Sequence, residues 1–322
     1  MRVNRRTFLG ACAAAGAGYC FAGPSASAAT SPGKRQYNLS ISIEALEKEP
    51  ERLEVFAKAG GTHVWLPGFF YGYWPMPLEK VCAWRKRAQD MGLDAQMINI
   101  PLGHPGDSLG SSDGDFPLTG PKHWKTAQLP DGQRYAGTSL HAPAADENVG
   151  AIKEIATCGV TRLFVDDDFR LARGPGMIGG CFCDEHKAGF LKKGGYAKSA
   201  WAELLDCVER RNLSPILRAW VEYTCDQLTG CFRAMQAATP TVEMGNMIMY
   251  FGAEKAGIRL TDYRGVPFRV GEMMFNDAGF GTVKGKTDEL YSCLFHRRFT
   301  TPELAYSETT AYPSDKLSAA NM

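Results

Sequence analysis

Three consecutive carboxylates are the residues of this chain with the clearest capacity for chemistry. Asp166, Asp167 and Asp168 directly follow an apolar run, Leu-Phe-Val, at residues 163–165. If that run is a strand, Asp166 and Asp168 face one way and Asp167 faces the other. Burial beside other negative charges raises the pKa of a carboxyl group, and a general acid needs a raised pKa. A turn, a helix cap or a divalent-ion site would use the same residues, so these alternatives stay open.

A second reactive group combines two thiols with an imidazole. Cys181, Cys183 and His186 form a Cys-x-Cys-x-x-His arrangement. Two thiolates and an imidazole this close in sequence can converge on one tetrahedral zinc ion, which then needs a fourth ligand from elsewhere. The candidates for that ligand are His104, which is the first choice, and then His123 and His141. The other interpretation is two surface thiols beside a solvated histidine.

The elements that must position these residues alternate between short apolar strands and amphipathic helices. The pattern predicts strands at residues 37–43, 63–67, 95–100, 162–166, 243–249, 268–274 and 304–307. It predicts helices at residues 50–59, 78–91, 148–157 and 287–299, and a long pair across 197–238. This alternation is typical of a parallel α/β protein. A (β/α)8 barrel (TIM barrel) fits it better than a doubly wound sheet, because no glycine-rich phosphate loop follows the first strand.

The predicted barrel occupies residues 37–322 and lacks its last strand. Too few residues follow Glu308 for a helix and an eighth strand. Either an N-terminal segment closes the barrel or the barrel is truncated, and we expect a truncated barrel. Two long loops rich in Gly, Pro, Asp and Ser interrupt it at residues 102–142 and 170–195. In this fold the loops that follow the strands carry the site.

Residues 1–29 are predicted to be an export signal, and residues 30–36 a linker. Arg5 and Arg6 precede a weakly apolar run rich in Ala and Gly, which ends in Ala26-Ser27-Ala28, a small-x-small cleavage site. This N-terminus resembles a twin-arginine (Tat) signal. The resemblance implies export by the Tat machinery to a periplasmic or extracellular location, with folding and metal loading before export.

Ten cysteines are present, and Cys12 and Cys20 belong to the signal. The others are not spaced like a small disulfide scaffold. Apart from the two in the Cys-x-Cys-x-x-His arrangement, they fall in helix-like segments and are expected to be small, buried apolar residues. These are Cys82, Cys158, Cys207, Cys225, Cys231 and Cys293.

The composition excludes several classes of protein. A formal net charge of +1 offers no electrostatic surface for nucleic acid. With 44% hydrophobic residues, the chain is not expected to be disordered. After Tyr37, no apolar stretch approaches the roughly 18–20 residues that span a bilayer, so we expect no transmembrane segment.

The acidic strand end, the Cys/His cluster and the segments after it resemble glycoside hydrolase family 42, the β-galactosidases of retaining clan A. The segments that carry the resemblance are residues 166–168, 181–190 and 217–223, and it covers roughly residues 37–312. The family binds a structural zinc through its cysteines, and its fourth strand ends in Asn-Glu, with the Glu as acid/base. This chain has Asp167 and Asp168 at those two positions, so the resemblance implies that Asp168 is the acid/base.

The family's nucleophile is a Glu at the end of the seventh strand, and Glu308 ends the seventh predicted strand. Glu272, on the sixth predicted strand, is a competing candidate. A retaining pair needs carboxyl groups about 5–5.5 Å apart, whereas an inverting pair stands about 6.5–9.5 Å apart. Because Asp is shorter than Glu by about 1.5 Å, Asp168 could move the pair toward the wider spacing.

Sugar rings stack their apolar faces on aromatic side chains, and the loop after the second predicted strand is aromatic at residues 69–74. Some of these rings could instead plug the end of the barrel, and Trp65 and Trp220 are expected in the core. The substrate-binding residues that we expect are Phe70, Tyr71, Tyr73, Trp74, Asn99, Asp166, Asp167 and Glu272.

The sequence therefore predicts an exported glycoside hydrolase that acts on O-glycosidic bonds of a carbohydrate, with Asp168 as acid/base and Glu308 as nucleophile. Two alternatives stay open: a metal-dependent sugar isomerase or epimerase barrel, and a non-catalytic glycan-binding barrel. Oligomers are common in the family, so an oligomer is compatible with the prediction.

Overall fold

The computed structural model describes residues 36–102, 120–166, 169–173, 177–248, 252–274 and 283–310. Residues 36–322 belong to one compact unit. Its strands are β1 (Asn38–Ser40), β2 (His63–Phe70), β3 (Asp94–Ile100), β4 (Thr126–Gln128), β5 (Arg134–Thr138), β6 (Arg162–Val165), β7 (Glu243–Ile248), β8 (Phe268–Met274) and β9 (Ala305–Thr310). Its helices are α2 (Ile43–Lys48), α3 (Arg52–Lys58), α4 (Leu78–Asp90), α5 (Ala144–Ala156), α6 (Asp184–Gly194), α7 (Ala200–Arg210), α8 (Pro215–Ala238) and α10 (Val283–His296). Short 3-10 turns occur at η1 (Ala253–Ala256), η2 (Leu260–Tyr263) and η3 (Pro302–Leu304).

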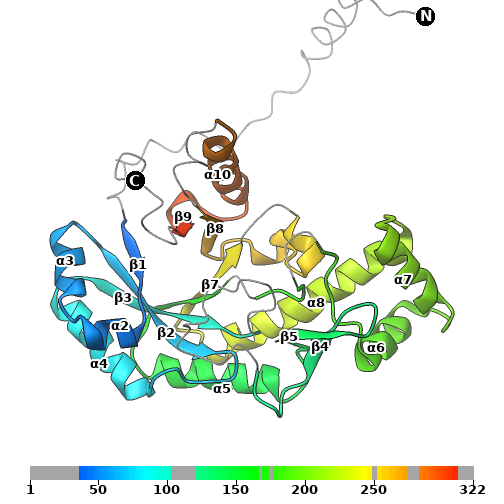
Figure 1. The fold of residues 1–322 in the computed structure, drawn as a ribbon, viewed down its shortest axis with the longest axis horizontal. Coiled ribbons are helices and arrows are strands. Elements are labelled where there is room, and N and C mark those ends of the chain that lie inside the picture. The colour runs from blue at the N-terminus through cyan, green and yellow to red at the C-terminus, as the bar shows by residue number, and fades with distance from the viewer. Residues whose placement is uncertain are drawn as a thin grey trace, which may run out of the picture. The chain divides into compact units, whose positions relative to one another are not determined.

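Seven parallel strands form one sheet in the order β1-β2-β3-β6-β7-β8-β9, which is also their order along the chain (Figure 1). Each of the predicted strands is present in it, so the predicted parallel (β/α)-barrel architecture is confirmed, with seven of its strands in the described residues. Sequential strands can pair in parallel because a helix returns the chain between them, as α4 does between β2 and β3. The first strand is shorter than predicted because Ser42 begins α2, accepting a hydrogen bond from Ala45 N at 3.1 Å.

The two faces of the sheet bury different sets of side chains. On one face Trp65, Ile98 and Phe164 belong to a small cluster, in which the Trp65 and Phe164 rings meet edge to face at 4.9 Å. The residues that alternate with them, such as Met97 and Leu163, belong to a larger core shared with α4, α5 and α8. Trp65 is 2% exposed and Trp220 is fully buried, which confirms their predicted place in the core.

Both long loops contain regular elements that were not predicted. The first contains the antiparallel β4–β5 hairpin, and the second contains the whole of α6. Phe182 N donates to Gln128 O at 3.0 Å, and Gln128 N donates to Cys181 Sγ at 3.4 Å. These bonds attach the hairpin to the segment that leads into α6.

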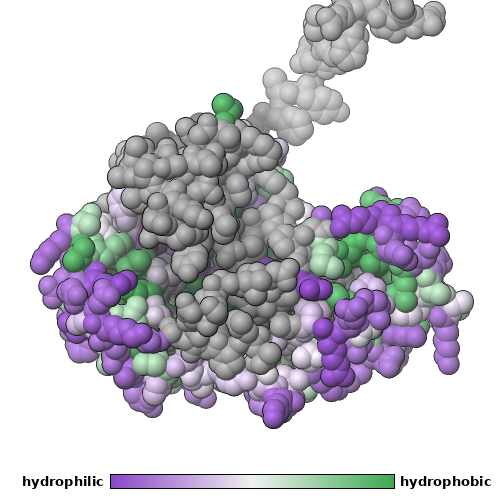
Figure 2. All heavy atoms as spheres, in the orientation of Figure 1, coloured by the Kyte–Doolittle hydropathy of each residue, from purple (hydrophilic) through white to green (hydrophobic). Residues whose placement is uncertain are grey.

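Helices α6 and α7 extend the fold beside α8 (Figure 1). They pack on it through an aromatic cluster that includes Phe190, Trp201 and Trp220, with ring centroids 5.2–6.5 Å apart. Burial of aromatic surface stabilises this extension. Hydrophilic residues cover most of the coloured surface on the face drawn in Figure 2.

None of the described helices has both the length and the apolar character that a membrane span requires.

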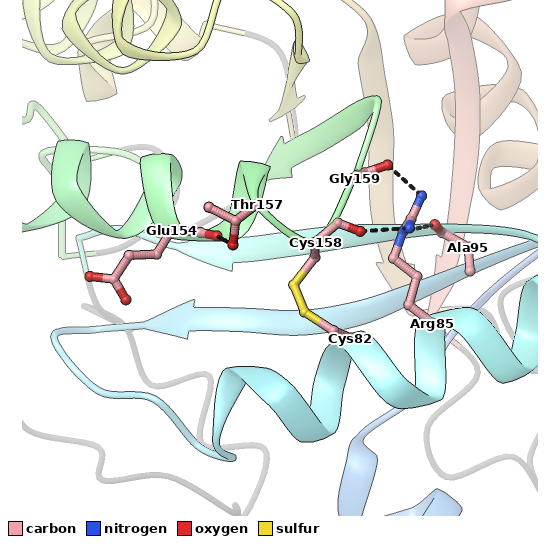
Figure 3. The surroundings of a disulfide bond; sticks show 7 residues. All are labelled: Cys82, Arg85, Ala95, Glu154, Thr157, Cys158 and Gly159. Carbon is pink, nitrogen blue, oxygen red and sulfur yellow. Dashed lines mark hydrogen bonds between the residues drawn. A yellow bond between two sulfur atoms is a disulfide. The ribbon is translucent and has the colours of Figure 1, made fainter.

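Cys82 and Cys158 form a disulfide, with their Cα atoms 5.4 Å apart (Figure 3). The expectation that they are unpaired apolar residues is therefore wrong. Cys82 lies in α4 and Cys158 follows α5, so the bond joins two helices that pack on the same core. Arg85, one turn after Cys82, donates hydrogen bonds to Ala95 O, Cys158 O and Gly159 O at 2.7–2.8 Å (Figure 3). The disulfide and Arg85 thus hold the same two segments together.

Replacing Cys82 and Cys158 together by alanine should lower the free energy of unfolding by about 2–5 kcal/mol, because the bond closes a long loop in the unfolded chain. The two residues are 76 positions apart. Chemical denaturation measures the difference. A reducing agent should lower the unfolding midpoint of the wild-type chain and leave that of the double variant unchanged. Equal midpoints for the two proteins without reductant would contradict the role of this bond.

Candidate functional site

Asp166 lies just beyond β6, at the end of the sheet where the strands finish. Its backbone N donates to Asn99 O at 2.8 Å, so the chain stays beside β3 for one residue after the strand. The Asp166 carboxylate is 18% exposed and accepts from Arg269 Nη1 at 3.4 Å. Arg269 is a buried residue of β8, and its guanidinium carbon lies 5.8 Å from the centre of the Phe164 ring. A buried positive charge from a strand two places away in the sheet therefore lies beside Asp166, the first carboxylate of the acidic run.

The described backbone places one of the two predicted catalytic residues, Glu308. Asp167 and Asp168 lie outside the described residues and follow Asp166 directly in the sequence. Glu308 lies in β9, where its backbone is paired with that of Gly271 on β8. Strands β6 and β9 are the fourth and seventh of the sheet, so the strand count behind both assignments is confirmed. Their roles in catalysis stay predictions.

Glu272 lies where the pairing between β8 and β9 is irregular. Gly271 pairs with Glu308 and Met273 pairs with Thr309, so Glu272 has no residue opposite it. An irregularity of this kind can redirect a side chain from the face that strict alternation would give it. Glu272 therefore stays a candidate beside Glu308.

Asn99 lies on the helix-facing side of the sheet, because it alternates with Ile98 and shares the face of Met97. Its side chain is fully buried, and its Oδ1 accepts a hydrogen bond from Phe69 N at 2.9 Å. A β-carbon added to Gly68 would meet this oxygen at 2.3 Å. The expectation that Asn99 holds a substrate hydroxyl does not agree with this position, in which the residue supports the irregular end of β2.

The aromatic segment at residues 69–74, which begins in the last two residues of β2, divides into buried and accessible rings. Tyr71 is 1% exposed and Phe70 is 8% exposed, whereas Tyr73 and Trp74 are partly exposed. Phe70 and Tyr73 exchange two backbone hydrogen bonds of 2.8 and 2.9 Å, which fix the turn between them. Trp74 packs on Phe69 with 5.2 Å between ring centres. Tyr73 and Trp74 are thus the rings that a ligand can reach, and Tyr71 serves packing.

His141, Cys183 and His186 bring one potential metal-binding atom each to within 4.8 Å of one another. Cys183 Sγ lies 3.3 Å from His141 Nε2 and 3.3 Å from His186 Nδ1. Tetrahedral bonds of about 2.3 Å from zinc to sulfur and about 2.0–2.1 Å from zinc to nitrogen would separate two ligand atoms by about 3.5 Å. The three side chains therefore fit a metal site.

The cluster contains two of the four ligands that we predicted first, Cys183 and His186. His141, a lower-ranked candidate, joins them from the loop between β5 and α5. Cys181 is buried beside the cluster but is not one of its three members, and its Sγ accepts from Gln128 N. Burial raises the pKa of the Cys181 thiol to about 12. His104 lies outside the described residues.

Burial keeps both imidazoles of the cluster neutral at pH 7, which is the form that binds a metal. It lowers the pKa of His186 to about 4, with His141 nearby acting in the same direction. It also lowers the pKa of His141, against the opposing effect of Glu185. Glu185 Oε2 lies 3.3 Å from His141 Nδ1, which leaves Nε2 facing Cys183. A carboxylate on the far nitrogen orients a metal-binding imidazole in this way.

Arg269 and Glu185 are site residues that the sequence analysis missed. Arg269 stands between Phe268 and Val270 in an apolar strand, and an isolated charge in such a run could have been noticed. Glu185 lies inside the Cys-x-Cys-x-x-His arrangement, where only the metal-ligand types were considered. Its role depends on His141, which is distant in sequence.

Solved structures of glycoside hydrolases have a similar fold. The chain is similar to a β-galactosidase from the psychrophilic Marinomonas ef1, with a TM-score of 0.53 and 11% identity, over 82% of this chain and 46% of that chain. It is also similar to β-galactosidases from Bacillus circulans sp. alkalophilus (TM-score 0.49, 11% identity, 82% and 43% covered) and from Rahnella sp. R3 (TM-score 0.49, 11% identity, 76% and 40% covered). The chain spans just under half the length of these proteins. No protein-family model and no curated protein matches the sequence.

Proposed function

We propose that this chain is a glycoside hydrolase that cleaves O-glycosidic bonds with two carboxylates. The observation that carries the proposal is the strand order, in which the acidic run follows the fourth strand and Glu308 lies in the seventh. Parallel strands end at one edge of a sheet, and a barrel gathers the residues at that edge around one opening. The shared fold with a β-galactosidase supports a carbohydrate as the substrate.

In this mechanism Asp168 donates a proton to the glycosidic oxygen while a Glu308 oxygen attacks the anomeric carbon. The bond to the leaving group breaks as the bond to Glu308 forms. Asp168 then takes a proton from water, which attacks the same carbon and releases Glu308. Arg269 favours the ionised form of Asp166, and a negative charge at Asp166 favours the protonated form of a neighbouring carboxyl group, here Asp168.

Replacing Asp168 by asparagine or Glu308 by glutamine should lower kcat for an activated aryl glycoside by on the order of 10²–10⁴-fold, because an amide can neither donate the proton nor attack. Glu303→Gln is the matched control, since Glu303 is an exposed carboxylate shortly before β9 and should keep full activity. Unchanged melting temperatures would show that the variants fold. Full activity in both amide variants would contradict the assignment.

Two other results would contradict the proposal and identify an alternative. Sugar isomerisation that is lost on chelation, with the essential metal held by carboxylates, would indicate an isomerase or epimerase. Calorimetric binding of oligosaccharides without turnover would indicate a glycan-binding barrel.

We also propose that the cluster of His141, Cys183 and His186 holds a structural zinc ion. One thiolate and two neutral imidazoles are a donor set that suits zinc. Cys181, buried beside the cluster, is a candidate for the fourth ligand, as is His104. A metal here would hold the loop before α5 against the N-terminal end of α6, which are far apart in sequence.

Metal analysis of the purified chain should find about one zinc ion per chain, and Cys183→Ser should lose it. His123→Ala is the matched control. His123 is an exposed histidine that pairs with Glu147 at 2.9 Å and lies outside the cluster, so this variant should keep its zinc. Removal of zinc should lower the melting temperature of the wild-type chain. Zinc retained by Cys183→Ser, or absent from the wild-type chain, would overturn this proposal.

We propose that the chain is exported by the Tat route. The paired arginines are the sequence feature that supports this, and the Cys82–Cys158 disulfide is compatible with it, because such bonds persist in oxidising compartments. Replacing Arg5 and Arg6 together by lysine should leave the uncleaved chain in the cytoplasmic fraction. Arg35→Lys, outside the predicted signal, should leave export unchanged. Cell fractionation and immunoblotting measure export. Equal export of the double variant and the wild-type chain would contradict this route.

A further inference from the structure

A cleft of about 370 Å³ lies between the β4–β5 hairpin and the N-terminal end of α6. Its volume falls within the range of sites for small molecules, about 300–1,000 Å³. The lining includes Lys122, Lys125 and Arg134, and also His141 and Cys183 from the metal-binding cluster. The cleft therefore has cationic side chains along its rim and the cluster in its wall.

Two of these cations have no anionic partner in the described part of the chain. Lys125 is held by Glu185. Lys122 and Arg134, in contrast, make no ion pair or side-chain hydrogen bond there, and both are exposed. Asp184 is the other carboxylate of the lining, and it occupies the first residue of α6, where the helix dipole favours a negative charge. The positive charges of Lys122 and Arg134 are therefore available to bind an anion in the cleft.

Neutral polar groups complete the lining. Thr126 Oγ1 is buried and has no hydrogen-bond partner among the described residues. Gln128 presents a partly buried amide in the same cleft. A buried hydroxyl without a partner is unfavourable, so a ligand hydroxyl that pairs with it is favoured.

We propose that this cleft binds a carboxylate-bearing sugar, with the carboxylate between Arg134 and Lys122 and the sugar hydroxyls on Thr126 and Gln128. The planar guanidinium of Arg134 can bind both oxygens of a carboxylate at once, and the flexible Lys122 adds a point charge. The sugar part of the proposal rests on the carbohydrate substrate proposed above. The anionic part rests on the charges of the cleft alone.

Titration calorimetry with galacturonate and galactose tests the proposal, because the two sugars differ in a carboxylate at one position. The zinc-loaded chain should bind galacturonate saturably and bind galactose at least about tenfold more weakly. Arg134→Met should lower the affinity for galacturonate by about tenfold, and added salt should lower it further. Asp184→Asn should raise it, because the competing negative charge is gone. Arg218→Met, which removes an exposed arginine of α8 outside the cleft, should leave it unchanged.

Three results would overturn the proposal. The first is an absence of saturable binding by galacturonate. The second is an equal affinity for acetate, which would mean that the cleft takes an anion and not a sugar. The third is binding that survives Arg134→Met and disappears when the metal is chelated, which would assign the carboxylate to the metal. Because calorimetry needs no turnover, the result is independent of Asp168 and Glu308. Galacturonate binding without any glycosidase activity would overturn the proposed glycosidase function and would still support the proposed binding in the cleft.

Discussion

Parallel pairing in the seven-stranded sheet is the constraint on which the candidate site depends. Each strand runs in the same direction as its neighbour, so Asp166, which follows β6, and the end of β9 lie at the same edge of the sheet. The backbone bond from Asp166 N to Asn99 O extends this pairing past the end of β6 and fixes where the acidic run begins. Asn99 supports the same edge from the helix-facing side, through its bond to Phe69 N.

A second set of contacts builds the metal-binding cluster outside the sheet. A backbone bond from Phe182 N to Gln128 O and a bond from Gln128 N to Cys181 Sγ attach the hairpin to the segment before α6. The chain that leaves the hairpin then brings His141 beside Cys183. The packing of the hairpin against the segment before α6 therefore forms both the cluster and the adjoining cleft. For this reason, cationic side chains from the hairpin and the residues before it line the same cleft as His141 and Cys183.

The strands could be predicted because buried parallel strands are short apolar runs separated by amphipathic helices, and each of the seven was found. Asn99 was expected to bind substrate, and its buried side chain instead accepts a hydrogen bond from Phe69 N at the end of β2, a contact that the sequence pattern does not reveal. The disulfide could not be predicted, because Cys82 lies in α4, Cys158 follows α5, and their spacing in the sequence carries no signal. The choice among His104, His123 and His141 likewise depended on the hairpin, whose position is set by contacts between distant segments.

The most direct test of the two-carboxylate account is to trap the intermediate. The chain would be incubated with an activated 2-deoxy-2-fluoro glycoside, which slows release of the sugar from the nucleophile, and the labelled peptide would be located by mass spectrometry. The account predicts a covalent sugar on Glu308. A sugar on Glu272, or hydrolysis of the parent aryl glycoside with no labelled peptide, would contradict it.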